Sequence, residues 1–309
     1  MPLSYTFIPP AAFVDIPVLR GMVVLESDDG KEAGYTVWYP VLQSYSQTPH
    51  FYPHRTKVLA SFAINTGNLS GLMSAEQIQE LASYGCEIMV HGRIHAGLGV
   101  TPTSGAITAG DTEITLPYHI GRRKAGYKYR IWEGAKEEEF VAISVSEGEH
   151  MDAGTITSAT PLVNSYGSGA FIELALSSIE DELLGCKADI EALGITVTNH
   201  VPPWHWLGGT PKTFVGEHFN STTTDVTIDG SGALNDPLTV DVYELKRHGI
   251  PQSEELLDNL LDSAKRDNHI LIIAAHADNP ILLGYIIRGA ISRGVRIATR
   301  QQMLDRFFN

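Results

Sequence analysis

Cysteine and positive charge are both scarce in this chain of 309 residues. Only two cysteines occur, Cys86 and Cys186, so a disulfide scaffold is excluded, and we expect both to be buried free thiols because each lies in an apolar periodic segment. Lysine and arginine number 22 against 36 aspartates and glutamates, which gives a formal net charge of -14. A surface of this sign disfavours nucleic acid and anionic membranes as partners.

Long apolar runs are also missing. No stretch approaches the roughly 20 apolar residues that cross a bilayer, and the first ten residues lack the basic and apolar regions of a secretory signal. We therefore expect a protein that is cytoplasmic as made, unless it leaves the cell by a route that the chain does not encode.

The pattern that is present alternates between strands and helices. Met22–Leu25 and Lys57–Ile64 are apolar runs typical of buried strands, and Cys86–Val90 is a third. Between the last two, Ser74-Ala-Glu-Gln77 forms a capping box that predicts a helix start, and Gly85 predicts its end. Strand, helix and strand joined by short loops predict parallel pairing and an α/β fold.

Residues 101–169 have a different pattern, in which apolar and polar residues alternate with a period of two, as in half-buried antiparallel strands. We interpret them as an inserted small all-β module, with residues 1–100 and 170–309 forming the main domain. A helical period returns over Phe171–Leu193. Further strands are expected at Ile195–Val201 and at Ile270–Ala275, the most apolar of the chain.

Three groups of polar residues follow expected strands. Asp28-Asp29-Gly30 comes after Met22–Leu25, and His91 and His95 come after Cys86–Val90. One carboxylate and two imidazoles spaced i, i+4 suit a divalent metal with an open coordination position, while the second carboxylate can take a proton from water. Taken alone, Asp-Asp-Gly is also a common turn, and a histidine pair at this spacing is also found in purely structural settings.

His276 directly follows the apolar run Ile270–Ala275. An imidazole held at the end of a buried strand is suited to donate a proton to a leaving group, although a hydrogen-bonded core histidine is the alternative. The carboxyl ends of parallel strands are where α/β folds assemble their sites, so the three groups together favour a metal-dependent hydrolase. We expect the remaining histidines without such a setting to lie at the surface: His54, His119, His150, His218 and His248.

These motifs resemble those of the polysaccharide deacetylases, also called carbohydrate esterase family four. Glu26-Ser-Asp-Asp-Gly30 is similar to the family's Thr-Phe-Asp-Asp-Gly, and His91-Gly-Arg-Ile-His95 to its His-Ser/Thr-x-x-His. Ile270 to His276 resembles the family's last strand and its histidine. The resemblance covers residues 18–100 and 170–309, in the family's order.

The resemblance implies a distorted (β/α)7 barrel into which the all-β module is inserted. It also implies that Asp29, His91 and His95 bind the metal, most often Zn²⁺ and sometimes Co²⁺ or Ni²⁺. Asp28 would be the general base and His276 the general acid in removing acetyl groups from a polysaccharide.

The chain departs from the family at two places. Gly92 stands where the family has serine or threonine, which removes a hydrogen bond that supports the loop. The arginine of the family's Arg-x-Pro-Tyr motif is absent; His200 or Arg247 would have to take its place, and the sequence does not decide between them. Trp204 follows at this motif and would offer an aromatic platform for a sugar ring.

We therefore expect a deacetylase acting on an N- or O-acetylated polysaccharide, a bacterial surface glycan. The absent arginine motivates an alternative, a carbohydrate-binding virion component that keeps the fold but has little or no turnover. A third alternative is a metal-dependent amidase or cyclic-imide hydrolase that acts on small molecules. The module also resembles small β modules of bacteriophage tail proteins, which would make virion tail proteins its partners and a bacterial cell surface its place of action. Association with a second copy of the chain is a separate possibility.

Overall fold

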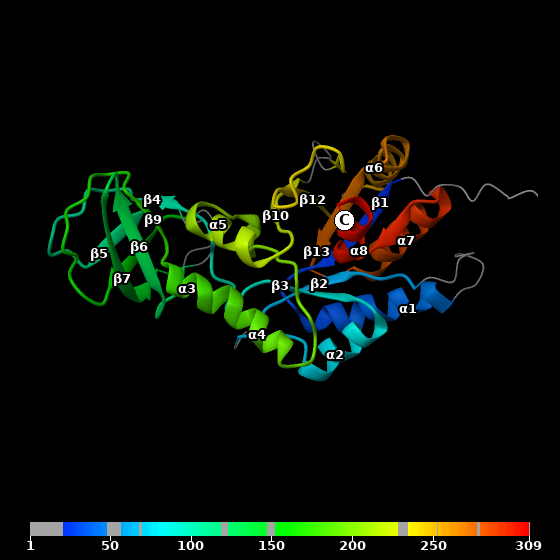
Figure 1. Ribbon diagram of the computed structural model, residues 1–309, viewed down its shortest axis with the longest axis horizontal. Helices are drawn as coiled ribbons and strands as arrows, with labels where there is room; N and C mark the ends of the chain where they lie inside the picture. The colour runs from blue at the N-terminus through cyan, green and yellow to red at the C-terminus, as the bar shows by residue number, and fades with distance from the viewer. Residues whose placement is uncertain are drawn as a thin grey trace, which may run out of the picture.

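The computed structural model describes residues 21–47, 57–67, 70–118, 123–146, 152–227, 234–251, 253–276 and 279–308. Figure 1 shows a barrel of strands and helices at one end of the molecule and an antiparallel sheet at the other. Among the described helices, none has the length and apolar character needed to cross a membrane. Both cysteines are free and buried, as expected.

The barrel is built on a mainly parallel sheet of eight strands. Strands β1 (Met22–Ser27) and β13 (Ile270–Ala275) pair in parallel along their whole lengths, and all their residues are buried. Such strands are covered on both faces, which explains the apolar runs Met22–Leu25 and Ile270–Ala275. The remaining members are β2 (Ser61–Ile64), β3 (Glu87–Val90), β10 (Thr223–Thr227), β11 (Leu234–Asn235), β12 (Leu245–Gly249) and β14 (Arg296–Ala298), with the main order β10-β12-β13-β1-β2-β3.

Single bridges close this sheet into a ring. Val90 at the end of β3 bridges His200, and Asn199 bridges Ser221, which leads into β10. The bridges rest on hydrogen bonds from Val201 N to Val90 O (2.9 Å) and from His200 N to Ser221 O (3.1 Å). The expected distorted barrel is therefore confirmed, but Ile195–Val201 is wrong as a full strand, because it pairs only at Asn199 and His200.

Helices surround the barrel. The expected helix after the capping box is α2 (Ala75–Tyr84): Ser74 and Gln77 cap each other, and the helix ends at Gly85 with φ +110°. Figure 1 shows α6 (Glu254–Asp267), α7 (Pro280–Arg293) and α8 (Arg300–Phe307) on one side of the barrel and α1 (Tyr39–Gln47) and α2 on another. Further helical segments are η1 (Gly34–Trp38), η3 (Pro203–His205) and α5 (Gly209–His218).

The second sheet is antiparallel throughout, in the order β4-β9-β6-β7-β8-β5. One connected set of buried apolar side chains includes residues of this sheet and of the barrel, such as Ile131 and Ile64. That the residues 101–169 form a separable module stays a prediction. The strands are β4 (Thr101–Pro102), β5 (Glu113–Leu116), β6 (Lys128–Glu133), β7 (Lys136–Val145), β8 (Gly154–Ser158) and β9 (Phe171–Leu174).

The helix expected over Phe171–Leu193 begins later than predicted. Phe171–Leu174 is strand β9, whose Ile172 pairs with Ile131 of β6, and α3 (Leu176–Glu180) follows it. The chain then continues through a π-helical turn, η2 (Asp181–Gly185), into α4 (Cys186–Glu191). π-helical turns inside helices are rare and often mark functional sites.

Candidate metal centre

The polar residues predicted from the sequence meet at the carboxyl ends of the barrel strands. Asp28 continues β1 and donates its N–H to Ala275 O at the end of β13 (2.9 Å). His91 continues β3 and donates its N–H to Ile64 O at the end of β2 (3.0 Å). His276 follows β13 directly. Adjacent parallel strands therefore place all three at the same end of the barrel.

Asp29, His91 and His95 form a compact triangle of ligand atoms. Asp29 Oδ1 lies 3.3 Å from His91 Nε2 and 3.2 Å from His95 Nε2, and the two Nε2 atoms are 3.2 Å apart. A tetrahedral zinc ion with bonds of about 2.0 to 2.1 Å has its ligands about 3.3 Å apart. The triangle thus has the dimensions of one face of a zinc tetrahedron, which leaves the fourth position open.

The protonation of His91 supports the same reading. His91 Nδ1 lies 2.9 Å from Val201 O, which only accepts hydrogen bonds, so Nδ1 carries the proton and Nε2 of the neutral ring is bare. This bare nitrogen faces Asp29 Oδ1 and His95 Nε2. With the His95 ring in the same tautomer, three acceptor atoms would face one point and fit a cation between them, and a carbonyl behind a ligating imidazole is the usual support for such a ligand.

The charges of the ligand groups also suit a cation. Burial by itself would raise the pKa of Asp29, but the adjacent imidazoles of His91 and His95 lower it strongly, so the carboxylate stays ionised. Burial lowers the pKa of His95 and favours the neutral ring that a metal needs. Lys31 Nζ, 2.9 Å from Asp29 Oδ2, holds the second oxygen of the carboxylate.

Of the two candidates for the missing arginine, Arg247 is the one that contacts Asp28. From β12, its Nη2 donates to Asp28 Oδ1 (2.7 Å) and Oδ2 (2.6 Å). Burial would raise the pKa of Asp28, but Arg247, His91 and His205 bring it down to about 2. The other candidate, His200, is fully buried and bonds through Nδ1 to Thr222 Oγ1 (2.9 Å) instead.

His276 and His205 share a cavity with Asp28. His276 Nε2 lies 3.7 Å from Asp29 Oδ2, and its side chain is 56% exposed. The cavity of about 220 Å³ is lined by Asp28, His205 and His276 together with Gly249, Ile250, Ala274 and Ala275. Burial and the charge of Arg247 lower the pKa of His205 to about 3, so this ring is neutral near pH 7. Sequence reasoning missed His205.

Strained backbone is concentrated around this site. Five non-glycine residues of the described chain have positive φ, and four of them are Asp29 (69°), His95 (59°), Trp204 (61°) and His205 (61°). Such conformations persist only where the surroundings determine them, and they cluster at functional sites. The Trp204 ring lies 5.1 Å from the His95 ring, centroid to centroid. The consecutive prolines before Trp204 were the only sequence signal for this turn.

Other histidine predictions have different outcomes. His218 is exposed, as expected, but His248 is fully buried, since β12 lies within the barrel wall between β10 and β13. His54, His119 and His150 lie outside the described residues.

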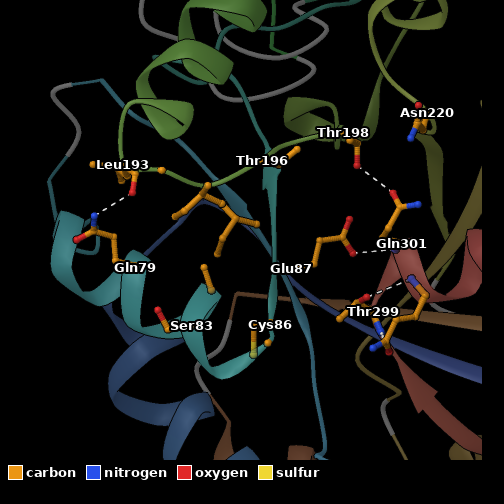
Figure 2. A pocket seen from close by; sticks show the side chains of 16 residues that line it. Gln79, Ser83, Cys86, Glu87, Leu193, Thr196, Thr198, Asn220, Thr299 and Gln301 are labelled. Atoms are coloured by element: carbon orange, nitrogen blue, oxygen red, sulfur yellow. Dashed lines mark hydrogen bonds between the residues drawn. The ribbon is translucent and has the colours of Figure 1, made fainter.

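A larger cavity of about 870 Å³ lies at the other end of β3, between α2, residues 193–198 and the start of α8. Figure 2 shows Glu87 directed toward Gln301, whose N–H it accepts at 2.9 Å. Glu87 also accepts from Ser61 Oγ (2.9 Å) and Asn199 Nδ2 (2.7 Å). Burial raises the pKa of the lining Cys86 thiol to about 12, so it is no nucleophile. This cavity contains none of the predicted site residues.

Comparison with known proteins places deacetylases among the similar solved structures. No family model and no curated protein matches the chain. The Xyl-CE4 domain of a multidomain xylanase from the hindgut metagenome of Trinervitermes trinervoides is similar at 13% identity, covering 93% of this chain and 91% of that one, with a TM-score of 0.48. A family 4 acetyl xylan esterase from Clostridium thermocellum in complex with cobalt is similar at 16% identity, covering 92% of this chain and 90% of that one, with a TM-score of 0.46. The peptidoglycan deacetylase PdaC from Bacillus subtilis is similar at 11% identity, covering 93% of this chain and 91% of that one, with a TM-score of 0.47. The comparisons give no support to a bacteriophage origin.

Proposed function

We propose that this protein is a metal-dependent hydrolase that removes acetyl groups from an N- or O-acetylated polysaccharide, with a bacterial surface glycan as the substrate class. The observation that carries the proposal is the triangle of Asp29 Oδ1, His91 Nε2 and His95 Nε2, with edges of 3.2 to 3.3 Å, beside the ionised Asp28. Asp29, His91 and His95 would hold the ion, and Zn²⁺ suits this donor set, with Co²⁺ or Ni²⁺ as substitutes. When bound, the ion would polarise the acetyl carbonyl and acidify water.

Asp28 takes the proton from the attacking water. Its contact with Arg247 keeps it ionised and fixes its orientation, so a carboxylate lone pair is available throughout the physiological pH range. General-base assistance of this kind contributes typically about 10² to 10⁴ in rate. The low pKa makes Asp28 a weak base, so the water must be acidified before the transfer is favourable.

His276 supplies the proton to the departing sugar amine or hydroxyl. Its ring stands beside Asp29 and is more than half exposed, so it meets both the reacting group and solvent. His205 presents a second donor. Arg247 Nη1 lies 3.4 Å from His205 Nδ1 and only donates, so Nδ1 accepts and the neutral ring carries its proton on Nε2. Asp28, His205 and His276 therefore surround the cavity with one acceptor and two donors.

The polysaccharide part of the proposal is supported by the tryptophans on either side of His205, which lines the cavity. Trp204 packs on His95, and Trp206, two residues later, is 49% exposed. Indole faces of this kind stack on sugar rings. Trp38, in contrast, is buried against Phe62 and offers no platform. Association with virion tail proteins, self-association and action at a bacterial surface stay predictions.

The test is acetate release from a panel of acetylated bacterial glycans by the zinc-loaded protein. We expect release by the wild type, a loss of about 10² to 10⁴ in kcat in Asp28→Asn with the metal retained, and loss of the metal in Asp29→Ala by elemental analysis. Asp236→Asn is the matched control, because the hydrogen bonds described for the Asp236 carboxylate stay within its own turn, from Leu238 N and Thr239 Oγ1. Full metal content in Asp29→Ala would overturn the ligand assignment. Wild-type release no higher than that of Asp28→Asn would leave the carbohydrate-binding alternative.

A further inference from the structure

The loop that carries His91 and His95 is shaped around a residue of another element. Gly92 has φ +89°, and a Cβ on it would lie 2.3 Å from Glu182 Oε1, closer than real Cβ contacts come. Glu182 lies on the π-helical turn η2 and is fully buried. The glycine that replaces the motif's serine or threonine thus creates the space that the Glu182 carboxylate fills.

Glu182 binds the backbone amides of the loop. Its carboxylate accepts from Ala96 N (2.8 Å, Oε1) and from Ile94 N (3.2 Å, Oε2), the two neighbours of His95. Its main-chain carbonyl accepts from Arg93 N (3.0 Å). Three amides of the loop therefore end on one residue. The left-handed conformation of His95, φ 59°, lies between two of these hydrogen bonds.

The Arg93 side chain ties the loop to the same helical segment. Its Nη1 lies 2.7 Å from Asp181 Oδ1, and its Nε lies 3.0 Å from Asp189 Oδ2. A Cβ on Gly185 would lie 2.7 Å from Arg93 Cδ. One glycine on the loop admits Glu182, and one glycine on the helix admits Arg93, so the two segments interlock.

The antiparallel sheet takes part through Tyr127, which lies just before β6. Tyr127 Oη donates to Glu182 Oε2 (2.7 Å), and Oη also lies 3.3 Å from Asp181 Oδ2. Burial and the charge of Glu182 raise the pKa of Tyr127, so the phenol remains a donor. The donors Ile94 N, Ala96 N and Tyr127 Oη together fix the Glu182 carboxylate.

We propose that Glu182 is the positioning residue of the metal site: it holds His95 in its strained, ligand-directed conformation in place of the motif's hydroxyl, and it links the site to the antiparallel sheet through Tyr127. The inference rests on the proposed metal-dependent function. It assigns to Glu182 no contact with substrate or metal. Groups that orient metal ligands in this way typically contribute about 10- to 100-fold to metal affinity.

The test compares Glu182→Gln with Glu173→Gln by zinc titration of the metal-free full-length protein, with Co²⁺ absorption as a probe of ligand geometry. Glu173 is a matched control, because it is also buried and accepts from Thr210 N (3.1 Å) and Thr210 Oγ1 (2.7 Å), away from the metal loop. We expect both variants to lose thermal stability. Only Glu182→Gln should lose about 10- to 100-fold in zinc affinity and change the cobalt spectrum.

Amide hydrogen exchange of Ile94 and Ala96 gives a readout that needs no metal, and it should be faster in Glu182→Gln than in the wild type and in Glu173→Gln. Zinc affinity within about twofold of the wild type in Glu182→Gln, or equal losses in both variants, overturns the inference. So does unchanged exchange of the two amides. A wild type that binds zinc but releases no acetate contradicts the proposed function and leaves the positioning role of Glu182 intact.

Discussion

Arg247 and Asp28 are 219 residues apart in the sequence, yet Arg247 Nη2 lies 2.7 and 2.6 Å from the two carboxylate oxygens of Asp28. Arg247 Nε also lies 3.0 Å from Glu26 Oε2, and Arg300 holds Glu26 Oε1 from the other side (2.8 and 2.5 Å). Two carboxylates and two guanidinium groups thus form a compensated set of charges inside the barrel. Removing one member of such a set is destabilising, because its partner is left as an unpaired buried charge.

Replacing Arg247 should therefore destabilise the fold strongly. We expect Arg247→Met to lower the free energy of unfolding by about 3 to 5 kcal/mol in urea titrations, since Asp28 and Glu26 lose their shared cation. Arg247→Lys should be intermediate, because one ammonium group does not reach both carboxylates as the planar guanidinium does. Arg293→Met is the control: Arg293 pairs with Asp258 and Asp262 near the surface, and such pairs contribute about 0.2 to 1 kcal/mol. Equal losses in Arg247→Met and Arg293→Met would contradict the assigned role.

The same contact predicts how stability depends on pH. Arg247 and the nearby imidazoles depress the pKa of Asp28 from 3.8 to about 2 against the effect of burial. A carboxyl group whose pKa is lower in the folded than in the unfolded protein stabilises the fold. This contribution is fully present above the pKa of the unfolded state and is lost as the pH falls through the pKa of the folded state. At about 1.4 kcal/mol per pKa unit, Asp28 contributes on the order of 2 kcal/mol, lost between about pH 4 and pH 2.

Urea titrations of the metal-free wild type and of Asp28→Asn across this range measure that contribution. The difference between the two proteins should shrink as the pH falls. A difference that stays constant from about pH 5 to pH 2 would mean that Asp28 is not held ionised by its surroundings.

Sequence patterns predicted the parts of the site that follow apolar strands. Each of these residues follows an apolar run whose composition indicates burial: Asp28, Asp29, His91 and His276. Parallel pairing of the runs therefore predicted that the four residues lie at the same end of the barrel. Arg247 was named only as one of two options. It lies on β12, Leu245–Gly249, whose polar sequence gives no strand period although Arg247 and His248 are fully buried. Charge pairing with Asp28 and Glu26, rather than apolar burial, places this strand in the wall.

Glu182 was not predicted because local pattern and tertiary packing conflict there. The helical period over Phe171–Leu193 holds for α3, but Phe171–Leu174 pairs with β6, and the π-helical turn shifts Glu182 inward. The sequence likewise showed Gly92 only as a missing hydroxyl. That a carboxylate from a distant helix fills the vacated space depends on a contact that no period in the sequence encodes.

Gly92→Ala should reveal this contact. A side chain in the left-handed region costs about 1 to 2 kcal/mol on its own, and the Cβ that the substitution adds would also overlap Glu182 Oε1. Gly110→Ala is the matched control, because Gly110 also has positive φ (+102°) but no atom within 4 Å of its added Cβ. We expect urea titrations to show a larger loss for Gly92→Ala than for Gly110→Ala.

A double-mutant cycle separates the overlap from the backbone strain. In a Glu182→Ala background, Gly92→Ala should cost less than in the wild type, with a coupling energy in the range of about 0.5 to 3 kcal/mol for residues in contact. Additive losses would show that Gly92 and Glu182 act independently.

Tyr127→Phe should weaken the metal site from outside the barrel. The change removes the hydroxyl that donates to Glu182 Oε2 (2.7 Å), so a buried carboxylate loses one of its donors at a cost of about 1 to 3 kcal/mol. Zinc affinity should fall, though less than in Glu182→Gln, because the amides of Ile94 and Ala96 still bind the carboxylate. Isothermal titration with Zn²⁺ and thermal unfolding measure the two effects.

Tyr129→Phe is the matched control, since the Tyr129 hydroxyl in the same sheet bonds only to the main chain of Lys124, at 2.7 and 3.0 Å. It should lower stability while leaving zinc affinity unchanged. If both variants lose affinity equally, the effect of Tyr127 is general destabilisation of the sheet. If only Tyr127→Phe loses zinc affinity, the antiparallel sheet supports the metal loop through Glu182. Removing residues 103–167 should then weaken zinc binding even where the barrel remains folded, because Glu182 would lose a donor that the barrel does not replace.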